Sequence, residues 1–127
     1  MLFQAGGTLL LPLNFGAIPH LWVALTGTNS SDENLWVNLT TRDNCVDETV
    51  VLQVGDHPFI KHETSVKYSD ASLFDAKRLK DSITAGYASR KEKCSSSLLK
   101  KIQAGLLKSE FSAEKYQIFL KKELGLL

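Results

Sequence analysis

Three histidines are the side chains of this chain best suited to moving protons near neutral pH. They are His20, His57 and His62, and the last two are five residues apart with Pro58 between them. Histidine titrates near neutrality and serves as a general base or a general acid. Two histidines with the neighbouring Asp56 would also suit a metal ion, although this spacing matches no metal-binding motif. In a third interpretation each histidine is structural, with its ring bonded to the backbone.

Cationic and hydroxyl side chains form two further short groups. Lys61 directly precedes His62, and Thr40, Thr41 and Arg42 are consecutive. Lysine and arginine stabilise negative charge, and a threonine hydroxyl donates a hydrogen bond to an anionic oxygen. These residue types therefore suit acid–base chemistry on an anionic substrate.

Other chemical motifs are missing from the sequence. It contains neither a phosphate-binding glycine loop nor paired Cys-x-x-Cys elements, so we expect no structural zinc, no other metal and no cofactor. The only two cysteines, Cys45 and Cys94, exclude a disulfide framework. We interpret both as unreactive thiols.

Charge is divided unevenly along the chain. The 127 residues have a net charge of +1, but residues 1–63 carry two basic and seven acidic side chains, and residues 64–127 carry 13 basic and seven acidic ones. The two parts thus have net charges of −5 and +6, a pattern that can mark anionic partners such as nucleic acid. The simpler alternative is that helices carry lysines on their solvent faces.

The elements that must position these residues change type near residue 74. Before it, short β-rich runs alternate with turn residues such as those at 14–16. This pattern predicts five or six antiparallel strands in a small barrel or sandwich. The predicted strands are 7–13, 18–26, 35–41, 48–54 and one or two within 59–68. Trp22 and Trp36 lie within these strands and are predicted to be core residues.

After residue 74 the apolar pattern becomes helical. We expect helices at 75–84, at 91–108 and after Ser112, which is a predicted N-cap. Gly105 weakens the second helix slightly. The chain is therefore predicted to be an α+β protein, with a barrel at 1–74 and a helical extension at 75–127 that packs on it as one compact unit. No apolar run reaches 18 residues and no basic region precedes the first run, so we expect a cytoplasmic protein without membrane contact.

The region 20–68 resembles a branch of the PemK/MazF-like toxin family. The most distinctive motif is GDHPFIKH at 55–62. The segment LLKKIQAG at 98–105 is similar to the helical tail of that branch. The other matching phrases are HLWVALT at 20–26, LWVNLTT at 35–41, DETVVL at 47–52 and SVKY at 65–68. The resemblance implies an SH3-like barrel with C-terminal helices. It also implies metal-independent cleavage of single-stranded RNA by a homodimer that an antitoxin protein inhibits.

The resemblance can be carried to individual residues, with one departure. Better-known members use a threonine or serine after the third strand, which Thr40 and Thr41 match, and an arginine where this chain has His20. The departure leaves two alternatives: a histidine-based endoribonuclease, or a non-catalytic domain of a mobile element that binds protein or nucleic acid. For the first we assign His20 and either His57 or His62 as the acid–base pair. The remaining assignments are Lys61 or Arg42 for charge stabilisation, Thr40 or Thr41 for phosphate binding, and Ser65, Lys67, Tyr68 and Arg42 for substrate binding.

Overall fold

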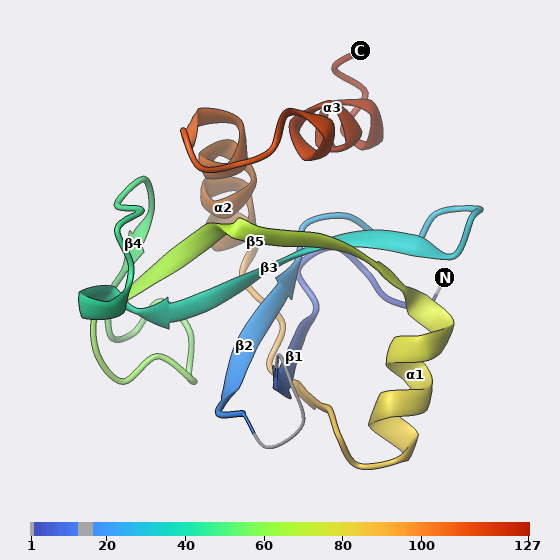
Figure 1. Ribbon diagram of the computed structural model, residues 1–127, viewed down its shortest axis with the longest axis horizontal. Helices are drawn as coiled ribbons and strands as arrows, with labels where there is room; N and C mark the ends of the chain where they lie inside the picture. Colours follow the sequence, from blue (N-terminus) through green and yellow to red (C-terminus); the bar gives the residue numbers. More distant parts are fainter. Residues whose placement is uncertain (1, 13–16) are drawn as a thin grey trace.

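The protein has an α+β fold, in which a curled antiparallel sheet is covered by helices (Figure 1). A computed structural model describes residues 2–12 and 17–127. Within these residues the strands are β1 (Thr8–Pro12), β2 (Pro19–Ala24), β3 (Glu33–Thr41), β4 (Val51–Leu52), β5 (Thr64–Asp75) and β6 (Ser89–Lys91). A 3-10 turn, η1 (Arg42–Asn44), follows β3, and the helices are α1 (Ala76–Thr84), α2 (Ser96–Lys108) and α3 (Glu114–Glu123).

The six strands form one sheet in the order β4-β5-β3-β2-β1-β6, and each pairs antiparallel with its neighbour. The long strand β5 pairs with β3 along most of its length, and the register shifts between Trp36 and Asn38. Such an irregularity bends a strand and increases its twist. The sheet consequently curls into a half-barrel, with β4 at one edge and β6 at the other.

Alternating side chains give the sheet two buried faces. On one face Leu21, Val23 and Leu25 pack in a core with residues of α2 and α3. On the other face Trp22 and Trp36 pack in a second core with residues of α1. Both tryptophans are buried, as predicted. Because side chains alternate along a strand, β2 and β3 each contribute to both cores.

Helix α2 lies unusually close to the sheet. Gly105 on α2 stands over Tyr68 and Val50, and the Tyr68 hydroxyl donates a 2.7 Å hydrogen bond to the carbonyl oxygen of Ile102. A Cβ atom at position 105 would lie 2.5 Å from Cγ2 of Val50. From the sequence, Gly105 was expected only to weaken the helix. In the structure, the absence of a Cβ atom at this position is what permits the close contact.

The predicted elements differ from the observed ones in four places. The strand predicted at 48–54 is reduced to Val51–Leu52, while β5 begins only at Thr64 and continues to Asp75. The helix predicted from 91 begins at Ser96, because residues 89–91 form β6 beside β1. Ala113, not Ser112, is the N-cap of α3; the Ser112 hydroxyl instead donates to the carbonyl oxygens of Leu106 and Ser109. The predicted turn at 14–16 and residue 13 lie outside the described residues.

Candidate functional site

A pocket of about 590 Å³ opens where the start of β2, the end of β3 and the segment before β5 meet. Five of the side chains predicted to act in catalysis line it, although they come from three separate parts of the sequence. They are His20, Thr40, Thr41, Lys61 and His62. The antiparallel register brings them together, because the beginning of β2 lies beside the end of β3, and the end of β3 pairs with the beginning of β5.

His20 is the second residue of β2 and is half-buried. Its Nδ1 lies 3.1 Å from the carbonyl oxygen of Leu39. A carbonyl only accepts, so Nδ1 must carry a proton and donate it to this bond. In the neutral ring Nε2 then holds the lone pair, and it forms no hydrogen bond with any residue that the structure describes. This arrangement fixes the ring and leaves Nε2 able to accept a proton.

Lys61 and His62 lie side by side in the segment that leads into β5, and both are exposed. The His62 Nδ1 lies 3.3 Å from the carbonyl oxygen of Glu63. The His62 carbonyl accepts a 2.9 Å hydrogen bond from the Thr64 hydroxyl, which ties the segment to the start of β5. A second proton-transfer group and a cation are thus presented on a backbone that is held locally.

Thr40 and Thr41 are the last two residues of β3, opposite Ser65 and Thr64 of β5. Both are half-buried. Neither hydroxyl is used in a hydrogen bond within residues 2–12 and 17–127. These hydroxyls are therefore available as donors to a ligand oxygen in the pocket.

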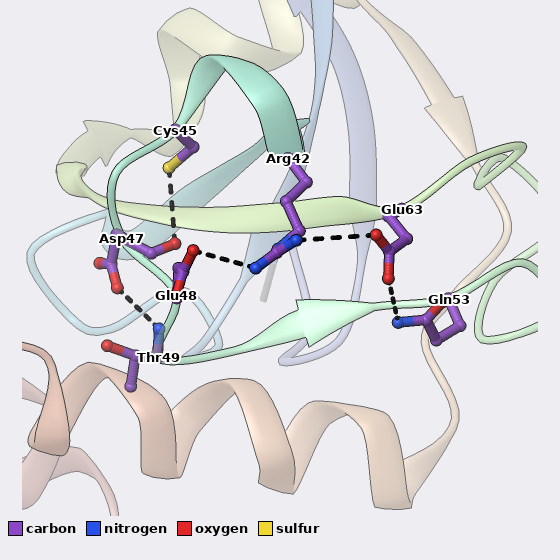
Figure 2. A network of polar contacts seen from close by, with 7 residues as sticks. All are labelled: Arg42, Cys45, Asp47, Glu48, Thr49, Gln53 and Glu63. Atoms are coloured by element: carbon purple, nitrogen blue, oxygen red, sulfur yellow. Dashed lines mark hydrogen bonds and ion pairs between the residues drawn. The ribbon is translucent and has the colours of Figure 1, made fainter.

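Arg42 does not line the pocket, and its side chain belongs to a network of polar contacts (Figure 2). Its guanidinium lies between two carboxylates, 2.9 Å from Glu48 and 3.8 Å from Glu63, and its backbone N–H donates to the Glu63 carbonyl at 3.2 Å. Gln53 Nε2 donates a 3.0 Å hydrogen bond to the other oxygen of Glu63. Arg42 follows Thr41 and Glu63 follows His62 in the chain. This network therefore links the backbone beside the two threonines to the backbone beside His62.

His57 lies in the protein interior and outside the pocket lining, only 3% exposed. Its Nδ1 accepts a 3.0 Å hydrogen bond from the Phe59 N–H, and its Nε2 donates at 2.5 Å to the carbonyl oxygen of Glu92. Both ring nitrogens are satisfied, so the structural interpretation fits His57. Of the two histidines considered as partners of His20, only His62 lines the pocket.

The predicted substrate-binding residues on β5 also lie away from the pocket lining. Tyr68 is completely buried, and desolvation, with a smaller contribution from Asp47, raises its pKa above the ordinary value. Ser65 is buried between β3 and β4. Lys67 lies 3.6 Å from Asp70, to which it is ion-paired. In this structure Tyr68 and Ser65 are core residues, which corrects their assignment as residues that touch substrate.

Both cysteines are free thiols. Cys94 is buried, which raises its pKa to about 11, whereas Cys45 is half-buried and its thiol donates to the Asp47 carbonyl at 3.7 Å (Figure 2). Asp47 is itself buried, accepting hydrogen bonds from the Thr49 N–H at 3.0 Å and the Ser109 hydroxyl at 2.7 Å. The thiolate of Cys94 is disfavoured, which fits the predicted lack of reactivity.

Sequence reasoning missed the apolar walls of the pocket and two polar residues, Asn44 and Thr64. Ile18 is 81% exposed and Phe59 41% exposed, and Asn44 of η1 adds an exposed amide. The sequence did offer one signal for the apolar walls, the apolar pair Phe59-Ile60 between the predicted site residues His57 and Lys61. In the structure only Ile60 of this pair is buried. Position 44 carried no signal, since an asparagine in a loop is ordinarily a turn residue.

No family model matches the chain, and no curated protein or solved structure matches it either. Within the part of the chain that the structure describes, no helix has the length and apolar character needed to cross a membrane. In the same residues no group of three histidine, cysteine or carboxylate side chains is placed to hold a metal ion.

Proposed function

We propose that this protein is an endoribonuclease that cleaves single-stranded RNA in the His20 pocket without needing a metal ion. The observation that supports this best is the meeting of two histidines, a lysine and two threonines in one pocket. Phosphodiester cleavage by the neighbouring 2′-hydroxyl needs a base, an acid and stabilisation of the phosphorane charge. The pocket lining offers residue types for all three tasks.

The proposed reaction assigns one task to each group. Nε2 of His20 takes the proton of the 2′-hydroxyl as the 2′-oxygen bonds to phosphorus. The bond from phosphorus to the 5′-oxygen breaks, and protonated His62 gives that oxygen a proton. Lys61 and the hydroxyls of Thr40 and Thr41 face the charge on the non-bridging oxygens. The products are a 2′,3′-cyclic phosphate and a free 5′-hydroxyl.

The finer parts of the family interpretation belong to the same proposal. We infer that the half-barrel is of the SH3-like type, and that the protein acts in the cytoplasm as the toxin of a toxin–antitoxin pair. An antitoxin protein would inhibit it, and the active form would be a homodimer. The strand-to-helix order and the position of Thr40 and Thr41 support this proposal, because both agree with the sequence resemblance to the PemK/MazF-like family.

The test incubates the purified protein with an end-labelled single-stranded RNA in the presence of chelator. We expect a ladder of products ending in 2′,3′-cyclic phosphate. His20→Ala and His62→Ala should each lower the rate about 10²–10⁴-fold, the usual range for a lost proton-transfer group. Lys61→Ala is compared with Lys122→Ala, which removes another exposed cation, on α3. Uncut RNA with wild-type protein, or full activity in both folded histidine variants, would refute the proposal.

The exposed apolar residues favour one alternative, a non-catalytic domain that binds protein or nucleic acid. Ile18 and Phe59 present apolar surface beside the polar groups, which suits a ligand with both characters. This alternative predicts binding without cleavage. If wild-type protein binds RNA or a peptide and Phe59→Ala abolishes that binding, while no RNA is cut, the alternative is the correct function.

A further inference from the structure

A second hollow, of about 320 Å³, lies between the N-terminal segment and the β6 edge of the sheet. Three cations line it, namely Arg90, Lys91 and Lys93, together with uncharged residues that include Gln4 and Thr8. No carboxylate side chain is part of this lining. The hollow is separate from the His20 pocket, and the two share no lining residue.

The three cations are exposed and their charge is not cancelled locally. None of them forms a salt bridge within the described residues; the ion pairs found there involve Arg42, Lys67 and Lys77. Lys93 Nζ contacts only a neutral partner, the amide oxygen of Gln4 at 3.1 Å. Glu92 lies between the two lysines in sequence, but the stretch 90–93 holds three cations and one anion, so its net charge is +2.

The backbone that carries these cations is held at several points. Arg90 and Lys91 pair with Leu9 and Thr8 of β1. The carbonyl oxygen of Glu92 accepts hydrogen bonds from the Thr8 hydroxyl at 2.8 Å and from His57. Two residues after Glu92, Cys94 donates its N–H to the Gly6 carbonyl at 2.9 Å. A fixed backbone lowers the entropy cost of binding a ligand.

Arg90 is oriented by an aromatic ring. Its guanidinium carbon lies 4.7 Å from the centroid of the Phe3 ring, and Phe3 is buried against Trp36. A guanidinium that stacks on a ring keeps its N–H edge free for a planar, two-pronged hydrogen bond to a phosphate. Phe3 thus gives the Arg90 side chain a defined position, although Arg90 is exposed.

We propose that this hollow binds the phosphate backbone of the same single-stranded RNA, outside the residues that cut it. The inference rests on the proposed function for the identity of the ligand, and on the structure for the cationic hollow. Arg90 engages one phosphate in the two-pronged geometry, and Lys91 and Lys93 neutralise adjacent phosphates as point charges. Residues 1–63 carry a net charge of −5, so this cationic edge supplies an attraction for phosphates that those residues lack.

The test measures binding of a fully 2′-O-methylated RNA, which cannot be cleaved, by fluorescence anisotropy at several salt concentrations. The variant carries Arg90→Ala, Lys91→Ala and Lys93→Ala together. If all three cations contact phosphates, the slope of log K against log salt should fall by about 2, and Kd at 0.1 M salt should rise about ten- to a hundredfold. The matched control carries Lys101→Ala, Lys108→Ala and Lys122→Ala, which removes the same charge from exposed helical positions.

Three results would overturn the inference. The first is an equal loss of affinity in the two triple variants, since bulk charge alone would then explain binding. The second is unchanged affinity in the first variant when its circular dichroism and thermal unfolding match those of the wild type. The third is a first triple variant that no longer binds vesicles containing anionic lipid but binds RNA as the wild type does, because the hollow would then be a membrane-binding site.

The proposed function is tested separately from this inference. His20→Ala and His62→Ala should leave binding of the 2′-O-methylated RNA nearly unchanged while lowering the cleavage rate of ordinary RNA about 10²–10⁴-fold. Hollow-dependent binding by a wild-type protein that cuts no RNA would refute the endoribonuclease proposal and keep the hollow as a nucleic-acid site. Cleavage that is insensitive to the first triple variant at all RNA lengths, with unchanged binding, would refute the hollow and keep the endoribonuclease.

Discussion

Replacing Gly105 by alanine should destabilise this protein, although alanine is the better helix former. Glycine in a helix interior costs about 1 kcal/mol relative to alanine, so propensity alone predicts stabilisation by that amount. In the structure a Cβ at this position would lie 2.5 Å from Cγ2 of Val50 and 2.8 Å from Cζ of Tyr68, and closer still to the Tyr68 hydroxyl oxygen. Non-bonded carbon atoms prefer about 3.5–4.0 Å, so a shift of about 1 Å is needed.

The cost of that shift has two parts. Overpacking in a filled core costs about 1–3 kcal/mol. If the Tyr68 ring moves away, the hydroxyl also loses its 2.7 Å bond to Ile102 and is left buried without a partner, at about 1–3 kcal/mol. Subtracting the helix gain of about 1 kcal/mol leaves a net loss of about 1–5 kcal/mol. Such a loss is a large fraction of the total stability of an ordinary domain.

Urea unfolding followed by tryptophan fluorescence measures the effect directly, because Trp22 and Trp36 are both buried in the folded state. With a slope of about 1–3 kcal/mol/M, a loss of 3 kcal/mol moves the midpoint down by about 1–3 M. Lys101→Ala, on the exposed side of the same helix, is the control and should change stability by less than about 0.5 kcal/mol. Tyr68→Phe combined with Gly105→Ala should cost less than the sum of the two single changes, since the closest atom is then absent.

Equal or greater stability in Gly105→Ala would refute the reasoning. It would mean that α2 stands farther from β5 than the structure places it, and that propensity alone governs this position. Additive effects of Tyr68→Phe and Gly105→Ala would refute the narrower claim that the tyrosine hydroxyl is the obstacle.

Three further predictions concern stability. Between pH 9 and 11 the ionisation of Cys94 should lower the free energy of unfolding by up to about 3 kcal/mol, because the unfolded thiol ionises near its ordinary pKa of 9.0 while burial holds the folded pKa at about 11. Cys94→Ala should remove this part of the fall in a urea-midpoint profile, and Tyr68, whose folded pKa is also raised, contributes to the fall that remains. His57→Ala should cost about 2–4 kcal/mol in urea unfolding, since it leaves the Phe59 N–H unpaired and opens a cavity; unchanged stability would contradict its structural role. Asp75→Ala should cost about 1 kcal/mol by thermal unfolding, because its carboxylate caps α1 at the N–H groups of residues 77 and 78, and Asp81→Ala on the exposed face is the control.

The fold class and most elements could be predicted from local pattern, and the failures have identifiable causes. Strands β2 and β3 were found because apolar and β-branched residues dominate them. Strand β6 was missed because Ser89, Arg90 and Lys91 are all exposed and show no apolar alternation. Its strand conformation comes from pairing with β1, far away in sequence, which no local pattern encodes.

The sequence predicted which residue types form the candidate site, but not which of the named residues line the pocket. Residue type indicated which side chains suit proton transfer, yet it did not distinguish His57 from His62. Burial distinguishes them, because one ring is enclosed and fully hydrogen-bonded and the other is exposed at the pocket. Tyr68 shows the same limit: a hydroxyl that suits a substrate equally suits a helix carbonyl in the core.

The sequence by itself determined the α+β class, the beginning of the helices near residue 74, the two buried tryptophans and the separation of charge. These follow from hydrophobic period and composition, which act over a few residues. Only the tertiary structure decided which histidines share a pocket, that three cations of one short segment line a hollow at the sheet edge, and why Gly105 must be glycine. Each of these depends on strand register and on the approach of a helix to a sheet, and so on contacts between residues far apart in the chain.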